Sequence, residues 1–134
     1  MAVVLDASAL VYAISSQAPA AAGLRRRLVE EFSHAPHLID AEVGNVLRRH
    51  VLTDELPPSA AEGLLGDAAT LVDMRYGTSE ALRGAAWALR DDITFYDALY
   101  VVLAQALRLP LLTADAKLMR TPTLPCDVEL VTAG

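Results

Sequence analysis

The sequence predicts an α/β fold, a three-layer α/β/α sandwich around a central, mainly parallel sheet. Short, continuous apolar runs such as residues 2–5 and 111–113 are typical of strands buried on both faces. Segments with helical periodicity separate these runs, and such alternation produces parallel sheets with right-handed crossovers. The length of 134 residues suits one domain that buries roughly two thirds of its unfolded surface, so we expect a single domain over residues 1–134.

The first strand is expected to lead into two helices. Asp6 closes the strand, and Ser8 is placed to cap a short helix that continues through Ile14. Pro19 separates this helix from a second one, whose apolar residues repeat at i,i+4 spacing as far as Phe32.

The middle of the chain is predicted to hold two helices and a strand. A brief extended segment around residues 36–39 is expected to lead to Asp40, a favourable N-cap for the third helix. After a pair of prolines, Ser59 and Glu62 form a capping-box pattern that predicts the start of the fourth helix. A second buried strand is predicted at residues 71–74.

The C-terminal part contains the strongest helical signal. One helix is expected after Gly77. Thr94 and Asp97 then repeat the capping pattern and open the most apolar helix, which is expected to run to about Leu107. Asp115 is a credible N-cap for a last, short helix. The two remaining strands are predicted at residues 111–113 and 128–131.

The composition argues against several classes of function. A net charge of −6 disfavours nonspecific coating of nucleic acid, because such binding depends on counterion release from phosphates. No apolar run approaches the ~20 residues of a membrane span, and the first residues lack the basic start of a secretory signal. We therefore expect a soluble, cytoplasmic protein without a membrane partner. Cys126, the only cysteine, is interpreted as a packing residue.

Local groups of basic residues could nevertheless contact a phosphate backbone. These groups are residues 25–27, residues 48–50 and the pair Lys117 and Arg120. The first group has a structural alternative, because two of its arginines precede a glutamate by four residues and can form helix ion pairs.

Four carboxylates stand where an apolar run ends or a helix begins, and they are the main functional signal. They are Asp6, Glu42, Asp97 and Asp115. Two carboxylates about 4 Å apart repel by roughly 4 kcal/mol at an effective dielectric near 20, so a cluster needs a cation or a shared proton. If the four converge, they describe a divalent-metal site that acts on phosphate.

Each acid also has a structural alternative. Asp97 completes a capping pattern, Asp115 can cap a helix, and Glu42 near a helix start gains about 0.3–1 kcal/mol from the dipole. Asp6 differs from these three because it ends a buried strand, where an unpaired charge is costly. It is therefore expected to be paired or bound to a metal.

Four short motifs follow one another in order along the chain. They are Leu5-Asp6-Ala7-Ser8, Asp40-Ala41-Glu42-x-x-Asn45, Tyr96-Asp97-Ala98-x-Tyr100 and Leu112-Thr113-Ala114-Asp115. Each motif alone is common. Their joint order and spacing resemble those of PIN-domain proteins, and most closely those of the VapC toxins of bacterial toxin–antitoxin pairs. The resemblance covers essentially the whole chain.

The resemblance implies an endoribonuclease that depends on Mg²⁺ or Mn²⁺. The four acids match the family's catalytic and metal-holding quartet, and Ser8 and Thr113 match hydroxyls that line the same pocket. A metal-activated water, rather than a protein nucleophile, would then hydrolyse the RNA phosphodiester bond. The donor set suits Mg²⁺, which typically takes one or two carboxylates, several waters and substrate phosphate.

Further polar residues are predicted around the quartet. Asn45 follows Glu42 by about one turn and is expected to orient it or a water on the metal. Arg49 is expected either to meet the RNA backbone or to form a surface salt bridge. Lys117 can approach a phosphate or remain solvated, and Asp40 can cap a helix or contact a metal through water.

The aromatic residues carry a weaker signal. Tyr12, Tyr96 and Tyr100 could stack on bases, but packing with a hydrogen-bonded hydroxyl is the favoured interpretation. Trp87 lies among small apolar residues and is expected in the core or at a subunit contact.

The resemblance also implies partners. These are an RNA substrate, a cognate VapB-like antitoxin and a second copy of the chain in a homodimer. An apolar groove for the antitoxin could have walls from two helices, although the same residues are more simply core. They are Leu24, Leu28, Phe32, Val43 and Leu47.

Two alternative functions stay open at this point. A phosphoacceptor receiver domain also gathers acids, a hydroxyl and a lysine around Mg²⁺, but it needs paired acids after the first strand, where this chain has Asp6 alone. The other alternative is a noncatalytic binding module of the same fold.

Overall fold

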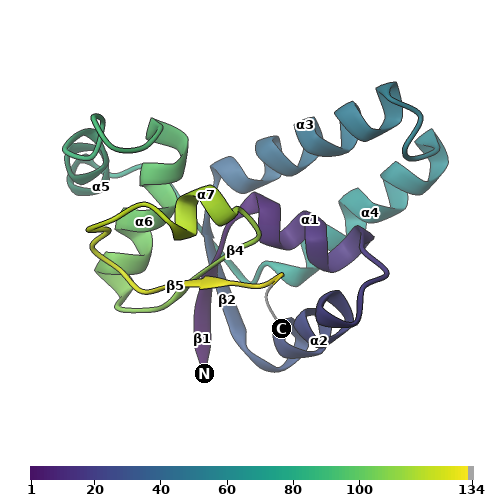
Figure 1. Ribbon diagram of the computed structural model, residues 1–134, viewed down its shortest axis with the longest axis horizontal. Coiled ribbons are helices and arrows are strands. Elements are labelled where there is room, and N and C mark those ends of the chain that lie inside the picture. The colour runs from purple at the N-terminus through teal and green to yellow at the C-terminus, as the bar shows by residue number, and fades with distance from the viewer. Residues whose placement is uncertain (133–134) are drawn as a thin grey trace.

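A computed structural model describes residues 1–132 and shows a five-stranded, parallel sheet in the order β3-β2-β1-β4-β5 (Figure 1). Every neighbouring pair of strands in this sheet is parallel. The strands are β1 (Ala2–Leu5), β2 (Phe32–Pro36), β3 (Met74–Tyr76), β4 (Leu111–Thr113) and β5 (Val128–Leu130). The helices are α1 (Ala7–Ser15), α2 (Pro19–Glu30), α3 (Leu38–Leu52), α4 (Pro58–Leu71), α5 (Glu80–Trp87), α6 (Phe95–Leu107) and α7 (Ala116–Met119).

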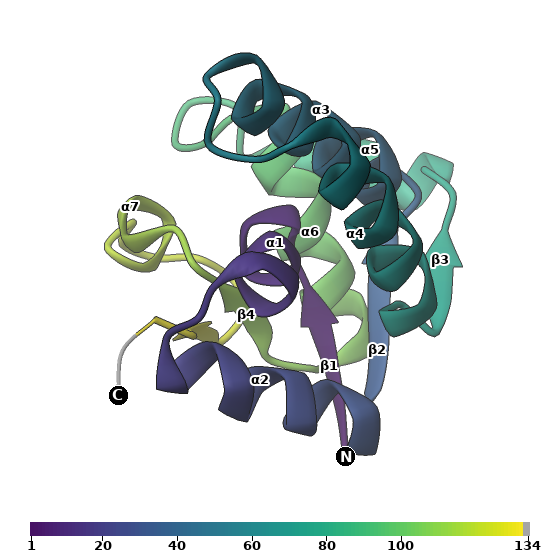
Figure 2. The same cartoon turned by 90° about the vertical axis from the view of Figure 1, so that its right-hand side faces the viewer.

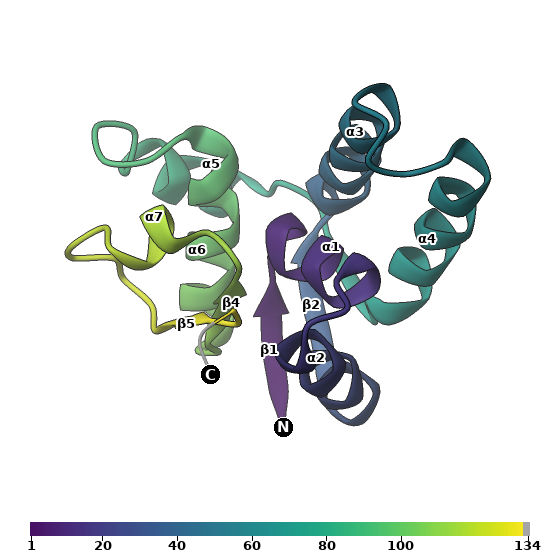
Figure 3. The ribbon, with the colours of Figure 1, turned by 45° about the vertical axis from the view of Figure 1, so that its right-hand side comes forward.

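The strand order places helices on both sides of the sheet. The chain moves outward from β1 to β2 and β3 and then returns past β1 to β4, so right-handed crossovers put α5 and α6 on the face opposite to α1. Helix α6 packs against β1, β2 and β4, and Figures 2 and 3 show α1 and α6 on opposite sides of β1. The predicted α/β/α sandwich with its parallel sheet is confirmed.

Two helices extend beyond the sheet. Helices α3 and α4 pack against each other as an antiparallel hairpin, which projects away from the strands in Figure 1. Both helices also contact α1, so the base of the hairpin is attached to the core. This arrangement brings the N-terminal part of α3, with Glu42 in its second turn, toward the carboxyl ends of the strands.

The core lies between the central strands and α1, α3 and α6. Val3, Val4 and Leu5 of β1 have no exposed surface, as expected for a strand covered on both faces. Tyr100 is among the largest fully buried side chains. Four apolar residues considered as walls of an open groove are instead buried in this core. They are Leu24, Leu28, Val43 and Leu47.

Most predicted elements are confirmed in place, including β1, β4, α2 and α6. Three helix starts differ from the prediction, and at α3 the N-cap is His37 rather than Asp40. Asp6 rather than Ser8 is the N-cap of α1, because its carboxylate accepts the N–H of Ala9 at 2.8 Å. Helix α4 begins at Pro58 after the N-cap Pro57, without a side-chain cap, so the predicted capping box is wrong.

The second and third strands also differ from the prediction. Phe32 begins β2, paired with Ala2, because pairing with β1 overrides a helical spacing that continues past the end of α2. The chain is therefore extended over Phe32–Pro36, before the predicted segment. Strand β3 starts at Met74 because α4 continues through Leu71.

Among the helices of residues 1–132, none has both the length and the apolar character needed to cross a bilayer.

Candidate active site

The strand order reverses between β1 and β4, and two of the four acids follow these strands. Leu5 pairs with Leu112, and the N–H of Asp6 donates to the carbonyl of Leu112 at 3.1 Å. Asp115 comes two residues after the end of β4's paired segment. In open parallel sheets, the crossovers diverge at such a point and leave a crevice beyond the carboxyl ends of the strands. Asp6 and Asp115 are thus placed at the position where these folds bind ligands.

Ser8 connects α1 to the end of β4. Its hydroxyl donates to Oδ1 of Asp6 at 2.7 Å and accepts the N–H of Ala114 at 2.9 Å. It also lies 3.2 Å from the hydroxyl of Thr113, which accepts the N–H of Asp115 at 3.0 Å. The serine and the threonine therefore hold two strand-end acids in one hydrogen-bonded network.

Glu42 enters the site from α3 and is held by α6. The hydroxyl of Tyr100 donates to Oε1 of Glu42 at 2.6 Å. Tyr100 is only 1% exposed, so its ring has a fixed position and directs the carboxylate. The predicted hydrogen-bonded, packed tyrosine is confirmed here. Its partner could not be inferred from the sequence, since the two residues lie 58 positions apart.

The other two acids lie at helix starts, as predicted. Asp97 is in the first turn of α6, where its N–H donates to the hydroxyl of the N-cap Thr94 at 3.1 Å. Asp115 is the N-cap of α7, and its Oδ1 accepts the N–H of Lys117 at 2.9 Å. Only the backbone N–H of Asp97 takes part in this cap, so the carboxylate of Asp97 stays available for other contacts.

The negative charges of the four acids repel one another. Burial raises the pKa of Asp6 from 3.8 to about 6, although the hydroxyls of Thr113 and Ser8 act to lower it. Burial also raises the pKa of Glu42 and of Asp97. The charge of Asp97 adds to the rise at Asp6 and Glu42, and that of Asp115 adds to the rise at Asp97. Asp97 thus acts on Asp6 and Glu42 and is itself acted on by the charge of Asp115.

The site fits a divalent cation in its chemistry. Its donors are carboxylate and hydroxyl oxygens, which Mg²⁺ and Mn²⁺ prefer, and a cation would relieve the mutual opposition of the charges. Within residues 1–132, no group of three or more His, Cys, Asp or Glu side chains is close enough to form a ready ligand cage. Mg²⁺ usually takes only one or two carboxylates and keeps several waters, so a closed cage is not required.

The structure brings some of the remaining predicted residues to the site and leaves others at the surface. Lys117 lies close enough to Asp97 for its charge to lower the pKa of that acid. Asn45 and Arg49 are exposed on α3. In the described part of the chain, Asn45 makes no side-chain hydrogen bond and Arg49 no ion pair. The side chain that contacts Glu42 is Tyr100, not Asn45.

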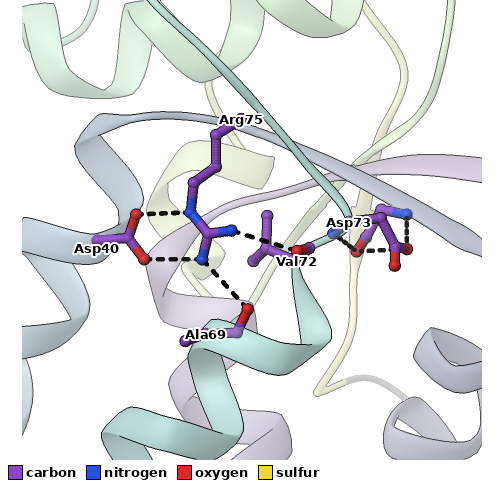
Figure 4. A network of polar contacts seen from close by, with 6 residues as sticks. Asp40, Ala69, Val72, Asp73 and Arg75 are labelled. Atoms are coloured by element: carbon purple, nitrogen blue, oxygen red, sulfur yellow. Dashed lines mark hydrogen bonds and ion pairs between the residues drawn. The ribbon is translucent and has the colours of Figure 1, made fainter.

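Asp40 has a structural role that differs from the predicted cap. The N-cap of α3 is His37, and the carboxylate of Asp40 accepts two hydrogen bonds from Arg75, at 2.6 and 2.9 Å. Arg75 also donates to the carbonyls of Val72 and Ala69, at 3.3 and 3.4 Å (Figure 4). This network ties β3 to α3 and α4.

Two arginines of the basic group at residues 25–27 have structural roles. Arg25 donates to the carbonyls of Ala13 and Ser16 at the end of α1. Arg27 forms the predicted pair with Glu31 and a second ion pair with Glu129.

Burial raises the pKa of the Cys126 thiol to about 11, in agreement with a packing role.

A cavity of about 450 Å³ opens beside two of the acids. Asp97 and Asp115 line it together with Lys117 and Arg90, whereas Asp6 and Glu42 do not. Arg90 was not recognised in the sequence, because it lies in the connection between α5 and α6 and belongs to no motif. The only available signal was its position seven residues before Asp97.

Comparison with known families and proteins supports this description. A family model described as PIN domain matches residues 3–124. Ribonuclease VapC1 of Mycobacterium tuberculosis H37Rv is 49% identical over 128 residues, which cover 96% of each chain. Ribonuclease VapC9 of the same strain is 34% identical over 132 residues, covering 96% of this chain and 98% of the relative.

Solved structures show the same fold. The structure of VapBC2 from Rickettsia felis, bound to a DNA fragment from their promoter, includes a chain that matches with a TM-score of 0.69 and 17% identity. The match covers 96% of this chain and 98% of that one. PAE2754 from Pyrobaculum aerophilum matches with a TM-score of 0.72 and 24% identity, over 98% and 94% of the two chains. At these identities, the likeness concerns the fold.

Proposed function

The chain is a VapC-type member of the PIN-domain family, and from this membership we propose that it is a metal-dependent ribonuclease toxin. In this proposal, Asp6, Glu42, Asp97 and Asp115 form the catalytic and metal-holding site, with Mg²⁺ or Mn²⁺ as the cofactor. The reaction is hydrolysis of a phosphodiester bond in RNA.

The observation that carries this proposal is the electrostatic coupling of the four acids. They come from the ends of β1 and β4 and from the N-terminal turns of α3 and α6. The charge of Asp97 raises the pKa of Asp6 and Glu42, and the charge of Asp115 raises that of Asp97. Carboxylates gathered in this way without a structural ion pair favour a cation-binding role. A purely structural role for each acid would not require them to converge.

Other side chains and backbone groups hold the proposed catalytic carboxylates in place. Ser8 and the N–H of Ala9 hold Asp6, and Tyr100 holds Glu42, so two carboxylates keep their orientation before substrate arrives. A bound divalent ion would supply a water of lowered pKa and neutralise charge on the phosphate. Lys117, beside Asp115, would contact a phosphate oxygen. No protein nucleophile is required.

The proposed partners follow from family membership. We expect a VapB-like antitoxin to block the site, and we expect the chain to form a homodimer. The apolar residues of α2 and α3 proposed as groove walls are buried in the core, so an antitoxin must use other surfaces. Family membership argues against the phosphoacceptor receiver alternative, whereas the noncatalytic alternative is open to direct test.

The experiment that tests the proposed function is cleavage of total RNA by the purified protein. Incubation in Mg²⁺ or Mn²⁺ should produce discrete new RNA ends, and excess EDTA should prevent them. An Asp97→Asn variant should not cleave. Equal cleavage by both proteins would reject the site assignment, and no cleavage by the unaltered protein with either ion would favour the noncatalytic alternative.

A further inference from the structure

Two cavities lie beside α5 and the start of α6. The first, of about 450 Å³, contains Asp97, Asp115, Lys117 and Arg90. The second, of about 510 Å³, is lined by Glu80, Arg83, Gly84, Trp87 and Phe95. Helix α5 packs against α6, whose first turn carries Asp97 (Figure 3). The second cavity therefore lies next to the proposed active site.

Trp87 and Arg90 connect the two cavities. The guanidinium of Arg90 lies 5.2 Å from the centre of the Trp87 ring, and its Nη1 donates to the carbonyl of Trp87 at 3.1 Å. This contact fixes the positions of both side chains. The planar guanidinium loses little conformational entropy when it forms. The pair presents an aromatic ring to one cavity and a cation to the other.

The aromatic side chains of this region are exposed. Trp87 is 59% and Phe95 is 38% exposed, so neither is a core residue; of the two positions expected for Trp87, the core is wrong and the subunit contact stays a prediction. Arg83 lines the second cavity with them, and Lys117 and Arg90 both line the first. Exposed aromatic rings between cations are the combination that binds single-stranded nucleic acid, by stacking and phosphate contact.

We propose that Trp87, Arg90 and Lys117 form a surface, here called the entry surface, that guides single-stranded RNA into the acidic site. Trp87 stacks on a base, and Arg90 and Lys117 contact successive phosphates. The inference rests on the proposed function and adds the path of the substrate. Arg90 and Trp87 are binding residues in this scheme, since neither contacts the acids that would hold the metal.

The charges that line the first cavity set a condition for RNA binding. Asp91 and Asp92 line it with Asp97 and Asp115, so carboxylates outnumber the two cations. Phosphates should therefore enter only when a divalent ion has offset the acids. RNA binding at the entry surface is expected to require such an ion.

A second copy of the chain is the other occupant that exposed aromatic residues suggest. The position of Arg90 and Lys117 in the cavity of Asp97, and the presence of Arg83 and Arg90 near Trp87, favour RNA. The test must nevertheless separate the two occupants.

Trp87 is the only tryptophan, so its fluorescence reports on this surface alone. The probe is a short, single-stranded oligoribonucleotide of mixed sequence, titrated in Ca²⁺ to slow cleavage, with its length checked afterwards. We expect RNA to quench the emission, and EDTA to abolish the response. A separately labelled oligomer measures affinity for variants that lack the tryptophan.

The variants have distinct expected effects. Trp87→Ala should weaken binding roughly 5- to 150-fold, as for a lost base stack, and Trp87→Phe should retain most of it. Arg90→Ala and Lys117→Ala should each lower the dependence of log affinity on log salt by about one phosphate contact. Arg26→Ala, which removes an exposed arginine from α2, is the matched control and should change neither quantity.

The outcomes separate this inference from the proposed function. If the unaltered protein cleaves RNA but the Trp87 and Arg90 variants behave like Arg26→Ala, the entry surface is wrong and the ribonuclease proposal stands. If no protein cleaves RNA, the proposed function fails. Emission that changes with protein concentration and not with RNA would show that a second copy covers Trp87, and would overturn the inference.

Discussion

The hydroxyl of Tyr100 donates a 2.6 Å hydrogen bond to Oε1 of Glu42 and so connects α6 to the second turn of α3. Tyr100 is buried, and its pKa is raised by burial and by the bond to Glu42, so it remains a neutral donor. The bond removes rotational freedom from a partly exposed carboxylate. We regard Tyr100 as a positioning residue for Glu42.

Tyr100→Phe should reduce metal affinity or RNA cleavage by about 10- to 100-fold, the usual effect of losing a residue that orients a ligand. The fold should be kept, with a loss of about 1 kcal/mol in the free energy of unfolding, because Glu42 can rehydrate. Mn²⁺ titration and thermal unfolding measure the two effects. Tyr12→Phe is the control, since the Tyr12 hydroxyl makes no hydrogen bond with the described residues. Wild-type Mn²⁺ affinity in Tyr100→Phe would contradict the positioning role.

The stability of the metal-free protein should fall as pH rises from about 4 to 6. The pKa of Asp6 is 3.8 in the reference state and about 6 in the fold, so the native state binds more protons across this window. The loss should be on the order of 2–3 kcal/mol. Urea unfolding in EDTA at several pH values measures it.

Asp6→Asn is the matched variant for this pH dependence, because asparagine can still accept the N–H of Ala9 as an N-cap. It should flatten the stability profile between pH 4 and 6. Since protons compete with the cation for Asp6, metal affinity of the unaltered protein should also weaken below about pH 6. A stability profile that rises over the window would refute the assignment of Asp6.

Ser8→Ala should destabilise the protein by about 1–3 kcal/mol, because the N–H of Ala114 loses its acceptor in a partly buried position. The pKa of Asp6 should rise further, since the serine hydroxyl lowers it. Chemical unfolding and Mn²⁺ affinity measure these effects. Ser15→Ala, which removes a hydroxyl bonded only to a carbonyl of its own helix, should leave Mn²⁺ affinity unchanged. Equal effects of the two variants would argue against the network.

Asp40→Asn should leave RNA cleavage within about twofold of the unaltered protein and lower stability by at most about 1 kcal/mol, the usual limit for an exposed ion pair. The reason is that Asp40 is engaged by Arg75 in the structure (Figure 4). Cleavage assays and thermal unfolding decide the question. A large loss of cleavage with unchanged stability would indicate instead that Asp40 takes part in metal binding.

The sequence predicted the elements whose signals are local. Continuous apolar residues placed β1 and β4, and Thr94 with Asp97 placed the start of α6, because both signals depend on neighbours within a few residues. The four acids were found in the same way, each at the boundary of an element. Errors occurred where a distant partner decides, as at Phe32, which pairs with β1 instead of extending α2.

The fold class, the positions of the four acids along the chain and their resemblance to the PIN-domain family can be read from the amino-acid sequence. What each carboxylate contacts is visible only once the chain is folded. Tyr100 reaches Glu42, Arg75 holds Asp40, and Arg90 lies against Trp87 beside the cavity of Asp97. Local hydrogen bonds and periodicity act over a few residues and are readable in sequence, whereas these contacts depend on how helices pack across the sheet.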